Sequence, residues 1–271
     1  IPRSEFTNVG MTIAKIHQMM ANDDPVTMLT CTDASLSGIM ESAGLDCILI
    51  GDSLGMVIQG QTTTIPVTID EIAYHLKCVV RGCHTPFIVA DMPYGTYNTF
   101  EDANRNACYL MQKGAHMIKL EGGLNFCPTV EFLSSRGIPV CAHIGLTPQS
   151  FHMTGSYKVQ GRSEGQVANL IKDARALVDS GALLMVLELM PTKTAGAITN
   201  AVSIPTIGIG AGKECNGQIL NIYDILGISA GRIPKFAKNY LAGQTSIRSA
   251  IDSYISEVKL RKYPGAQHSF D

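Results

Sequence analysis

The sequence has no apolar run near the roughly 20 residues that a membrane-spanning helix needs. Its start, Ile1-Pro2-Arg3-Ser4-Glu5-Phe6, lacks a signal-peptide core, although a removed targeting segment is left open because the first residue is not Met. Lysine and arginine form no cluster, and 21 basic against 23 acidic residues give a formal net charge of −2. Such a charge pattern does not hold rows of phosphates or an anionic membrane. We therefore expect a cytoplasmic protein with small-molecule partners, and neither nucleic acid nor membrane as a partner.

Cysteine pairs with the spacing of metal or redox sites are also missing. None of the eight cysteines stands in a C-x-x-C motif, and Cys47 and Cys141 lie within apolar runs. Free cysteine behaves as a small hydrophobic residue, and disulfides are rare in the cytosol. We therefore expect buried, reduced thiols rather than disulfides.

Short apolar segments rich in β-forming residues recur along the chain. Their near-continuous hydrophobicity is typical of parallel strands that are covered on both faces. The predicted strands are residues 26–31, 47–50, 87–90, 117–120, 140–142, 184–187 and 206–209, with a weaker one near 225–228.

Helix signals stand between these strands. Thr68 and Glu71 form a capping box at the start of a predicted helix. Glycines follow several helical stretches just before the next strand, as at Gly44 and Gly114. Alternating strands and helices fit either a closed barrel or an open doubly wound sheet.

The positions of the ionisable residues favour the barrel, because an open sheet gathers its ligands at one switch point whereas a barrel gathers them from many strand ends. A length of 271 residues is also typical of a barrel, which averages about 250. We predict an α/β fold: one (β/α)8 TIM-barrel domain with parallel strands over residues 1–271. Residues 1–20 are expected to be partly flexible, and residues 260–271 to form a C-terminal tail.

Five ionisable residues stand at or just after the ends of successive apolar strands: Asp52, Asp91, Glu121, His143 and Glu188. Carboxylates this close to a core cost several kcal/mol each to bury unless a cation or a partner compensates them. Three oxygen donors without neighbouring sulfur ligands suit Mg²⁺ better than Zn²⁺. We therefore predict a metal site at Asp52, Asp91 and Glu121. The alternative is that each carboxylate caps a helix or pairs with a basic residue.

Other residues in these segments can act on a substrate. Lys119 lies two residues before Glu121, so both side chains leave the same face of a strand. Lys119 can hold a substrate carboxylate, form a structural ion pair with Glu121 or act as a Schiff-base nucleophile. His143 can orient a substrate or carry a proton near neutral pH. Glu188 is the predicted general base, with a role as a partner of the metal or a lysine as the alternative.

The glycine-rich stretch Gly208-Ile209-Gly210-Ala211-Gly212 follows a predicted strand. It lacks the following helix and acidic residue of a dinucleotide-binding motif. We interpret it as the loop after the seventh barrel strand, where backbone amides can approach a ligand or simply form a tight turn.

Several motifs in a fixed order carry a family resemblance, from about residue 26 to Tyr263-Pro264-Gly265. The matching stretches are residues 51–56, 60–71, 90–93, 118–123, 143–150, 157–161, 207–212 and 234–238. On these residues the sequence resembles the ketopantoate hydroxymethyltransferases. One departure is visible: Thr32 stands where members of the family often carry tyrosine, so we expect an aromatic ring near the substrate to be missing after the first strand.

The resemblance implies transfer of the one-carbon unit of the cosubstrate 5,10-methylenetetrahydrofolate to 3-methyl-2-oxobutanoate. Mg²⁺ stabilises the enolate, and the product is 2-dehydropantoate, on the route to pantothenate and coenzyme A. Glu188 is then the proton acceptor. The implied substrate-binding residues are Asp52, Ser53, Asp91, Lys119 and His143. The resemblance also implies a homodecamer, in whose assembly the C-terminal segment is expected to help.

Two other functions use the same residues. A metal-dependent aldolase or lyase of the phosphoenolpyruvate-binding barrel group would show the same barrel and metal site, and folate dependence separates it from the transferase. A non-catalytic 2-oxo acid binding protein would keep the ligands without turnover.

Overall fold

Eight parallel strands close into a barrel in the order β1 to β8, with β8 paired to β1. The structure, a computed structural model, describes residues 10–229 and 233–271. The strands are β1 Val26–Thr30, β2 Cys47–Ile50, β3 Phe87–Asp91, β4 Met117–Glu121, β5 Val140–Gly145, β6 Leu184–Glu188, β7 Thr206–Ile209 and β8 Gly217–Leu220. The predicted TIM barrel is thus confirmed.

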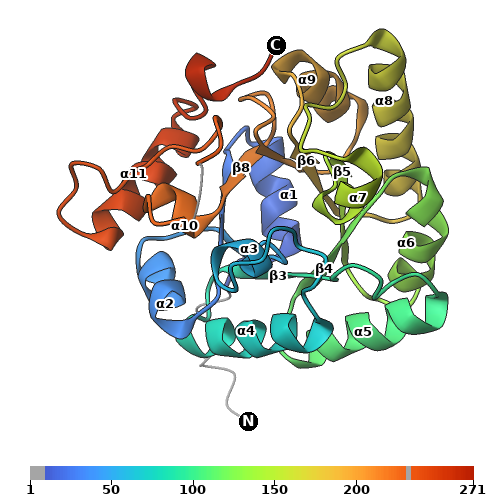
Figure 1. Cartoon of the computed structure of the whole chain (residues 1–271), viewed down its shortest axis with the longest axis horizontal. Coiled ribbons are helices and arrows are strands. Elements are labelled where there is room, and N and C mark those ends of the chain that lie inside the picture. Colours follow the sequence, from blue (N-terminus) through green and yellow to red (C-terminus); the bar gives the residue numbers. More distant parts are fainter. Residues whose placement is uncertain (1–9, 230–232) are drawn as a thin grey trace.

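Helices surround the barrel (Figure 1), and at least one helix follows each strand except β7, which connects directly to β8. The α-helices are α1 Ile13–Ala21, α2 Ala34–Ser42, α3 Leu54–Val57, α4 Ile69–Gly82, α5 Phe100–Gln112, α6 Cys127–Ser134, α7 Phe151–Thr154, α8 Glu164–Asp179, α9 Thr192–Ala201, α10 Ile222–Ile225 and α11 Ile247–Lys259. The described part of the chain also contains the short 3₁₀ helices η2 Leu124–Phe126, η3 Pro148–Ser150 and η4 Ala266–His268. None of the helices within the described ranges is long and apolar enough to cross a membrane.

Two hydrophobic clusters fill the molecule. One lies between the strands and the outer helices, and the other lies inside the barrel. Helix α1 contributes to the inner cluster, because Ile16 is fully buried against residues such as Val26, Cys47 and Phe87 at the beginnings of strands. The helix therefore closes the N-terminal end of the barrel and leaves the opposite end open for a site.

The local signals in the sequence act as expected. The Thr68 side chain caps α4 by accepting a hydrogen bond from the Glu71 amide, and the Glu71 carboxylate accepts one from the Thr68 amide. Gly44 and Gly114 both have positive φ, a conformation that glycine adopts without strain because it lacks a Cβ atom. All eight cysteines are free; five of them are buried as predicted, whereas Cys78, Cys108 and Cys127 are only half-buried.

The eighth strand was predicted in the wrong place. Residues 225–228 contain the end of α10, the left-handed Gly227 and the exposed Ile228, whereas β8 is Gly217–Leu220. A glycine and a glutamine make β8 look unlike a buried strand. Gly217 is nevertheless required there, because a Cβ atom would stand 2.5 Å from the backbone oxygen of Val26 in β1.

The two ends of the chain pack on the barrel where they are described. Residues 1–9 of the expected flexible segment lie outside the described residues, and residues 13–21 form α1. At the other end, the backbone oxygen of Phe270 accepts a hydrogen bond from the amide of Thr192, at the start of α9. The segment after α11 therefore returns to the mouth of the barrel.

Tyr254 of α11 supports the closure of the barrel. Its hydroxyl lies 2.9 Å from the backbone oxygens of both Met28 in β1 and Gln218 in β8, and the side chain is fully buried.

We predict that Tyr254→Phe lowers the free energy of unfolding in urea by about 1–2 kcal/mol, because a buried hydrogen bond is lost. Tyr109→Phe is the control, since the Tyr109 hydroxyl bonds Asp70 on the surface. Equal changes for both variants would contradict this account.

Candidate functional site

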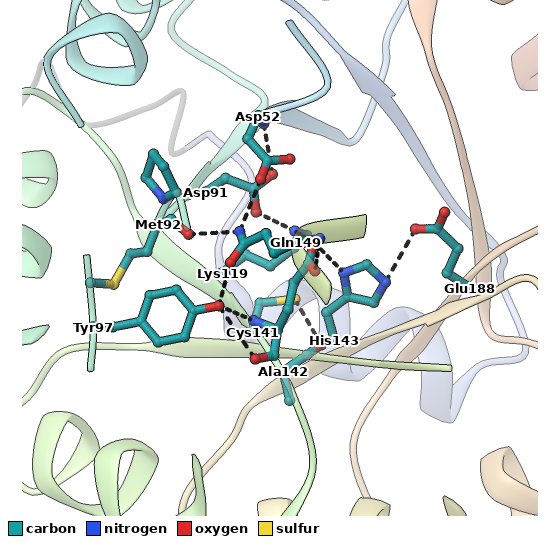
Figure 2. A network of polar contacts seen from close by, with 12 residues as sticks. Asp52, Asp91, Met92, Tyr97, Lys119, Cys141, Ala142, His143, Gln149 and Glu188 are labelled. Atoms are coloured by element: carbon teal, nitrogen blue, oxygen red, sulfur yellow. Dashed lines mark hydrogen bonds and ion pairs between the residues drawn. The ribbon is translucent and has the colours of Figure 1, made fainter. Parts of the chain in front are cut away.

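The C-terminal ends of β2 to β6 bring the predicted ionisable residues together at one mouth of the barrel (Figure 2). The strand register places Asp91 beside Lys119 and Glu121 beside His143. The structure thus joins all five predicted strand-end residues, and Lys119, into one polar network.

One half of the network is a buried ion pair. The Lys119 ammonium binds the Asp91 carboxylate directly and lies 3.8 Å from Oε1 of Glu121. The backbone amide of Asp52 donates to Oδ2 of Asp91 at 3.0 Å. Because one oxygen of Asp91 is bound by Lys119 of β4 and the other by the amide of Asp52, just after β2, its carboxylate is fixed in position.

The other half of the network is centred on His143. Its Nδ1 atom lies 3.4 Å from Oε1 of Glu121, and its Nε2 atom lies 3.2 Å from Oε2 of Glu188. Neither approach is aligned well enough for a hydrogen bond, so the imidazole interacts with the two carboxylates mainly as a charge. His143 therefore links the fully enclosed Glu121 to Glu188, whose side chain is 16% exposed.

Gln149 connects the two halves and was not singled out as a site residue from the sequence. Its side-chain amide donates to Oδ2 of Asp52 at 2.9 Å and to the backbone oxygen of Met92 at 3.0 Å. Its backbone amide donates to Oε2 of Glu121 at 3.0 Å. The hydroxyl of Tyr97 donates to Oε1 of Gln149, which fixes the orientation of the amide. The only sequence signal was the match of residues 143–150 to the family pattern.

Burial and neighbouring charges shift the pKa values of Asp52, Asp91 and Lys119. Burial, together with the charges of Asp91 and Glu121, raises the pKa of Asp52 well above its usual range. Burial also raises the pKa of Asp91, against the opposing effect of Lys119. Burial acts to lower the pKa of Lys119, but the three carboxylates outweigh it and keep the ammonium charged.

On the His143 side of the network, neighbouring charges outweigh burial in setting the pKa values of Glu121 and His143. Burial acts to raise the pKa of Glu121, but His143 and Lys119 bring it below its ordinary value. For His143, burial and Lys119 act to lower the pKa, and Glu121 and Glu188 raise it to about 9. Near neutral pH, Glu121 is therefore ionised and His143 is protonated.

The carboxylates offer part of the donor set that a metal ion needs. Among the described residues, no three acidic, histidine or cysteine side chains are arranged to hold a metal ion by themselves. Mg²⁺ is often bound by only one or two carboxylates, with water and substrate oxygens as its other ligands. Asp52 and Asp91 supply such a pair, and the raised pKa of Asp52 reflects negative charge that a cation would compensate. Their donor set fits Mg²⁺ completed by water or substrate.

The network lies at the floor of a cavity of about 380 Å³, which is in the range of small-molecule sites. Ser53 also lines this cavity, and its Oγ atom accepts a hydrogen bond from Asn221 at 3.4 Å. Apolar side chains form much of the wall, including Leu49 and Val186. The site can therefore hold a small acid with an aliphatic group.

Two further expectations from the sequence concern the loops at the mouth. The first two residues of the glycine-rich stretch, Gly208 and Ile209, belong to β7, and only Gly210 to Gly212 form the predicted loop after it; Gly210 and Gly212 have positive φ. A Cβ atom on Gly210 would stand 2.7 Å from the ring of Phe236, so the glycine permits close packing there. Thr32 is buried, its hydroxyl has no hydrogen-bond partner among the described residues, and it is not among those that line the cavity.

Comparison with known proteins identifies close relatives. A family model described as ketopantoate hydroxymethyltransferase matches residues 10–266. The chain is 51% identical over 266 residues to 3-methyl-2-oxobutanoate hydroxymethyltransferase from Paraburkholderia phymatum, covering 98% of each chain. It is 50% identical to 3-methyl-2-oxobutanoate hydroxymethyltransferase 1 from Burkholderia cenocepacia, again over 98% of each.

Solved structures of lower identity share the fold. A putative phosphonomutase from Burkholderia cenocepacia J2315 superposes with a TM-score of 0.60 at 14% identity, over 80% of this chain and 95% of that one. A 2,3-dimethylmalate lyase of the PEP mutase/isocitrate lyase superfamily gives 0.54 at 16% identity, over 77% and 80%. At these identities the likeness concerns the barrel alone.

The raised pKa of His143 predicts a pH-dependent stability. Because the folded-state pKa of about 9 lies above the ordinary value of about 6.5, the stabilisation is complete below pH 6.5 or so and is lost as the pH rises through 9. We expect the difference in unfolding free energy between the wild type and His143→Gln, measured in urea with EDTA, to shrink across that range.

His116→Gln is the matched control, because burial lowers the pKa of His116 and its contribution is lost on the acidic side instead. The folded and ordinary pKa values set a range from about 6.5 to 9. If the difference in unfolding free energy between the wild type and His143→Gln stays constant across this range, the ring is not held as a cation.

Proposed function

Because the chain belongs to the ketopantoate hydroxymethyltransferase family, we propose that this mouth of the barrel joins the one-carbon unit of 5,10-methylenetetrahydrofolate to 3-methyl-2-oxobutanoate with the help of Mg²⁺. Membership makes the protein a hydroxymethyltransferase of 3-methyl-2-oxobutanoate, and the name of the family places it in the pathway to pantothenate. The folate cosubstrate, the metal and the roles of individual residues are the proposal.

One observation carries the proposal. Buried acidic and basic groups surround the floor of a cavity whose walls are largely apolar. A branched 2-oxo acid has the complementary form, with a carboxylate and a keto oxygen at one end and an aliphatic group at the other. Lys119 supplies a buried positive charge for the acid, and Ser53 supplies a hydroxyl beside it. His143, protonated near neutral pH, adds a second positive charge.

Asp52 and Asp91 would hold the magnesium ion, and Glu121 would face it as the third predicted acidic residue. When bound, the cation supplies positive charge that stabilises the oxygen of the enolate as negative charge develops there. Oxygen atoms of the oxo acid would complete the set of donors, which agrees with a protein that offers two adjacent carboxylates rather than a complete metal cage.

Glu188 is the proposed base. Its carboxylate lines the cavity from β6, and Oε2 lies next to the His143 ring. Oε1 would take the proton from C3 of the oxo acid, while the His143 cation holds the carboxylate in place. The carbon that loses the proton then attacks the one-carbon unit, and the electron pair of the broken carbon–nitrogen bond leaves with tetrahydrofolate.

Close relatives favour the transferase over the other two functions considered from the sequence. The lyase structures share only the fold with this chain, whereas both hydroxymethyltransferases cover nearly all of it at about half identity. The homodecamer, the role of the C-terminal segment in assembly and the cytoplasmic location stay predictions.

Proton NMR in D₂O tests the function directly. With the enzyme and Mg²⁺ alone, 3-methyl-2-oxobutanoate should lose its C3 proton signal, because the first half-reaction needs no folate. The hydroxymethyl signal should appear only after methylenetetrahydrofolate is added. Absence of both exchange and product would overturn the proposal, and cleavage of the acid without folate would point to a lyase.

The same measurement on Glu188→Gln tests the base. We expect C3 exchange to fall by about 100-fold or more, since general-base catalysis contributes about 10²–10⁴, with oxo-acid affinity largely kept. Asp91→Ala should instead lose oxo-acid binding, because the partner of Lys119 and a metal ligand are both removed. Exchange at the wild-type rate in Glu188→Gln would remove Glu188 from this role.

Gln149 is predicted to support the metal by orienting Asp52. We expect Gln149→Met to weaken the binding of Mn²⁺, measured by electron paramagnetic resonance without substrate, by about 10- to 100-fold, as is typical when a partner of a metal ligand is lost. Gln218→Met is the matched control, because Gln218 is equally buried but donates to Gly212. The same Mn²⁺ affinity in both variants would count against the positioning role.

A further inference from the structure

The cavity is larger and more varied than the oxo acid requires. Its floor consists of the buried charged network, whereas its outer part is lined by several half-buried or exposed side chains together with some buried ones. This outer part contains Met56, Tyr157, Phe236 and Phe270, which offer flat and apolar surfaces. A small branched acid at the floor leaves that outer part for a second, larger and partly aromatic molecule.

Contacts within the chain hold Phe270 at the wall. The Lys235 ammonium donates to the backbone oxygen of Ser269 at 2.6 Å and lies 4.9 Å from the centre of the Phe270 ring. The amide of Thr192 donates to the backbone oxygen of Phe270 at 3.0 Å. Phe236, on a segment that precedes α11, lines the same cavity. The aromatic part of the wall is therefore positioned before any ligand arrives.

Among the residues that the structure describes, Asp224 is the one acidic residue of the lining outside the polar network at the floor. It belongs to α10, which follows β8 at the open end of the barrel, and it is only 8% exposed. Its Oδ1 atom accepts a hydrogen bond from the hydroxyl of Ser229 at 2.5 Å. Burial raises the pKa of Asp224, which shows that its charge is poorly solvated. A carboxylate offers about four acceptor positions, so one hydroxyl leaves room for further donors.

We propose that the outer part of the cavity binds the pterin ring of the folate cosubstrate, with the Asp224 carboxylate accepting hydrogen bonds from N3–H and the 2-amino group. This assignment rests on the proposed function. The two parallel N–H groups of that ring edge resemble those of a guanidinium group, which pairs with a carboxylate through two hydrogen bonds. Phe236 and Phe270 supply apolar surface for the ring.

The charge of Asp224 also selects the end of the folate that enters. The glutamate tail of a folate carries carboxylates, which a buried and poorly solvated Asp224 would repel. The pterin end carries the donors instead, and it also carries N5, one of the two nitrogens that hold the one-carbon unit. The end of the cosubstrate that matches Asp224 is therefore the end that must come close to the oxo acid.

Calorimetry with 5-formyltetrahydrofolate tests the assignment without turnover. We expect Asp224→Asn to bind this stable folate about 10- to 100-fold more weakly than the wild type, as befits loss of a hydrogen-bonded charge. Asp46→Asn is the matched control: Asp46 is also 8% exposed but bonds Thr27 near the N-terminal end of the barrel. Its folate affinity should stay within about twofold of the wild type, within the error of such comparisons.

A folate analogue with a methyl group in place of the 2-amino group makes the test specific. The wild type should bind the analogue more weakly than 5-formyltetrahydrofolate, whereas Asp224→Asn should discriminate little between the two. Equal discrimination by both proteins would overturn the contact, even if the affinity of the variant had fallen for structural reasons.

The exchange of the C3 proton separates this assignment from the proposed function. In the absence of folate, Asp224→Asn should exchange the proton of 3-methyl-2-oxobutanoate at the wild-type rate, because Asp224 does not belong to the floor network. If the wild type exchanges the proton and binds folate, but Asp224→Asn binds folate equally well, only the pterin assignment is overturned. If the wild type neither exchanges the proton nor binds folate, the proposed function itself fails.

Discussion

The buried ammonium group of Lys119 is the interaction on which the mouth of the barrel depends. It binds Asp91 and lies near Glu121, and all of these side chains are at most 4% exposed. An ion removed from water costs several kcal/mol unless its neighbours compensate it. The lysine and the carboxylates therefore require one another. Asp52 carries the charge that remains least compensated, which is why a divalent cation suits this side of the site.

Barrel closure makes this arrangement possible. Parallel strands in register place their C-terminal ends side by side, so residues from five consecutive strands meet although each is remote in sequence. The other end of the barrel is filled by α1, whose Ile16 packs among the inward-facing apolar residues. One end thus supplies stability and the other holds the costly charges.

The cavity has two regions that differ in chemistry, a charged floor and a largely apolar outer part. At the floor, fixed charges suit a small acid and the proton transfer from its carbon. Phe236, Phe270 and the buried carboxylate of Asp224 also line this cavity, outside the charged network. Segments from the last quarter of the chain form much of this outer region. The ends of the barrel strands thus provide the floor. Segments that follow the strands provide the surface above it, where we propose that the second molecule binds.

The sequence by itself determined the barrel and most of the floor. Apolar strands, helix caps and left-handed glycines are local signals, and a charge after a buried strand stands out because burying it is costly. The misplaced eighth strand shows the limit, since β8 is specified by the tight approach of Gly217 to β1 rather than by an apolar pattern. Only the tertiary structure revealed Gln149 between Asp52 and Glu121, and Asp224 in the outer wall. Neutral amides and lone carboxylates carry no local signature, because their role comes from partners that the fold brings from distant parts of the chain.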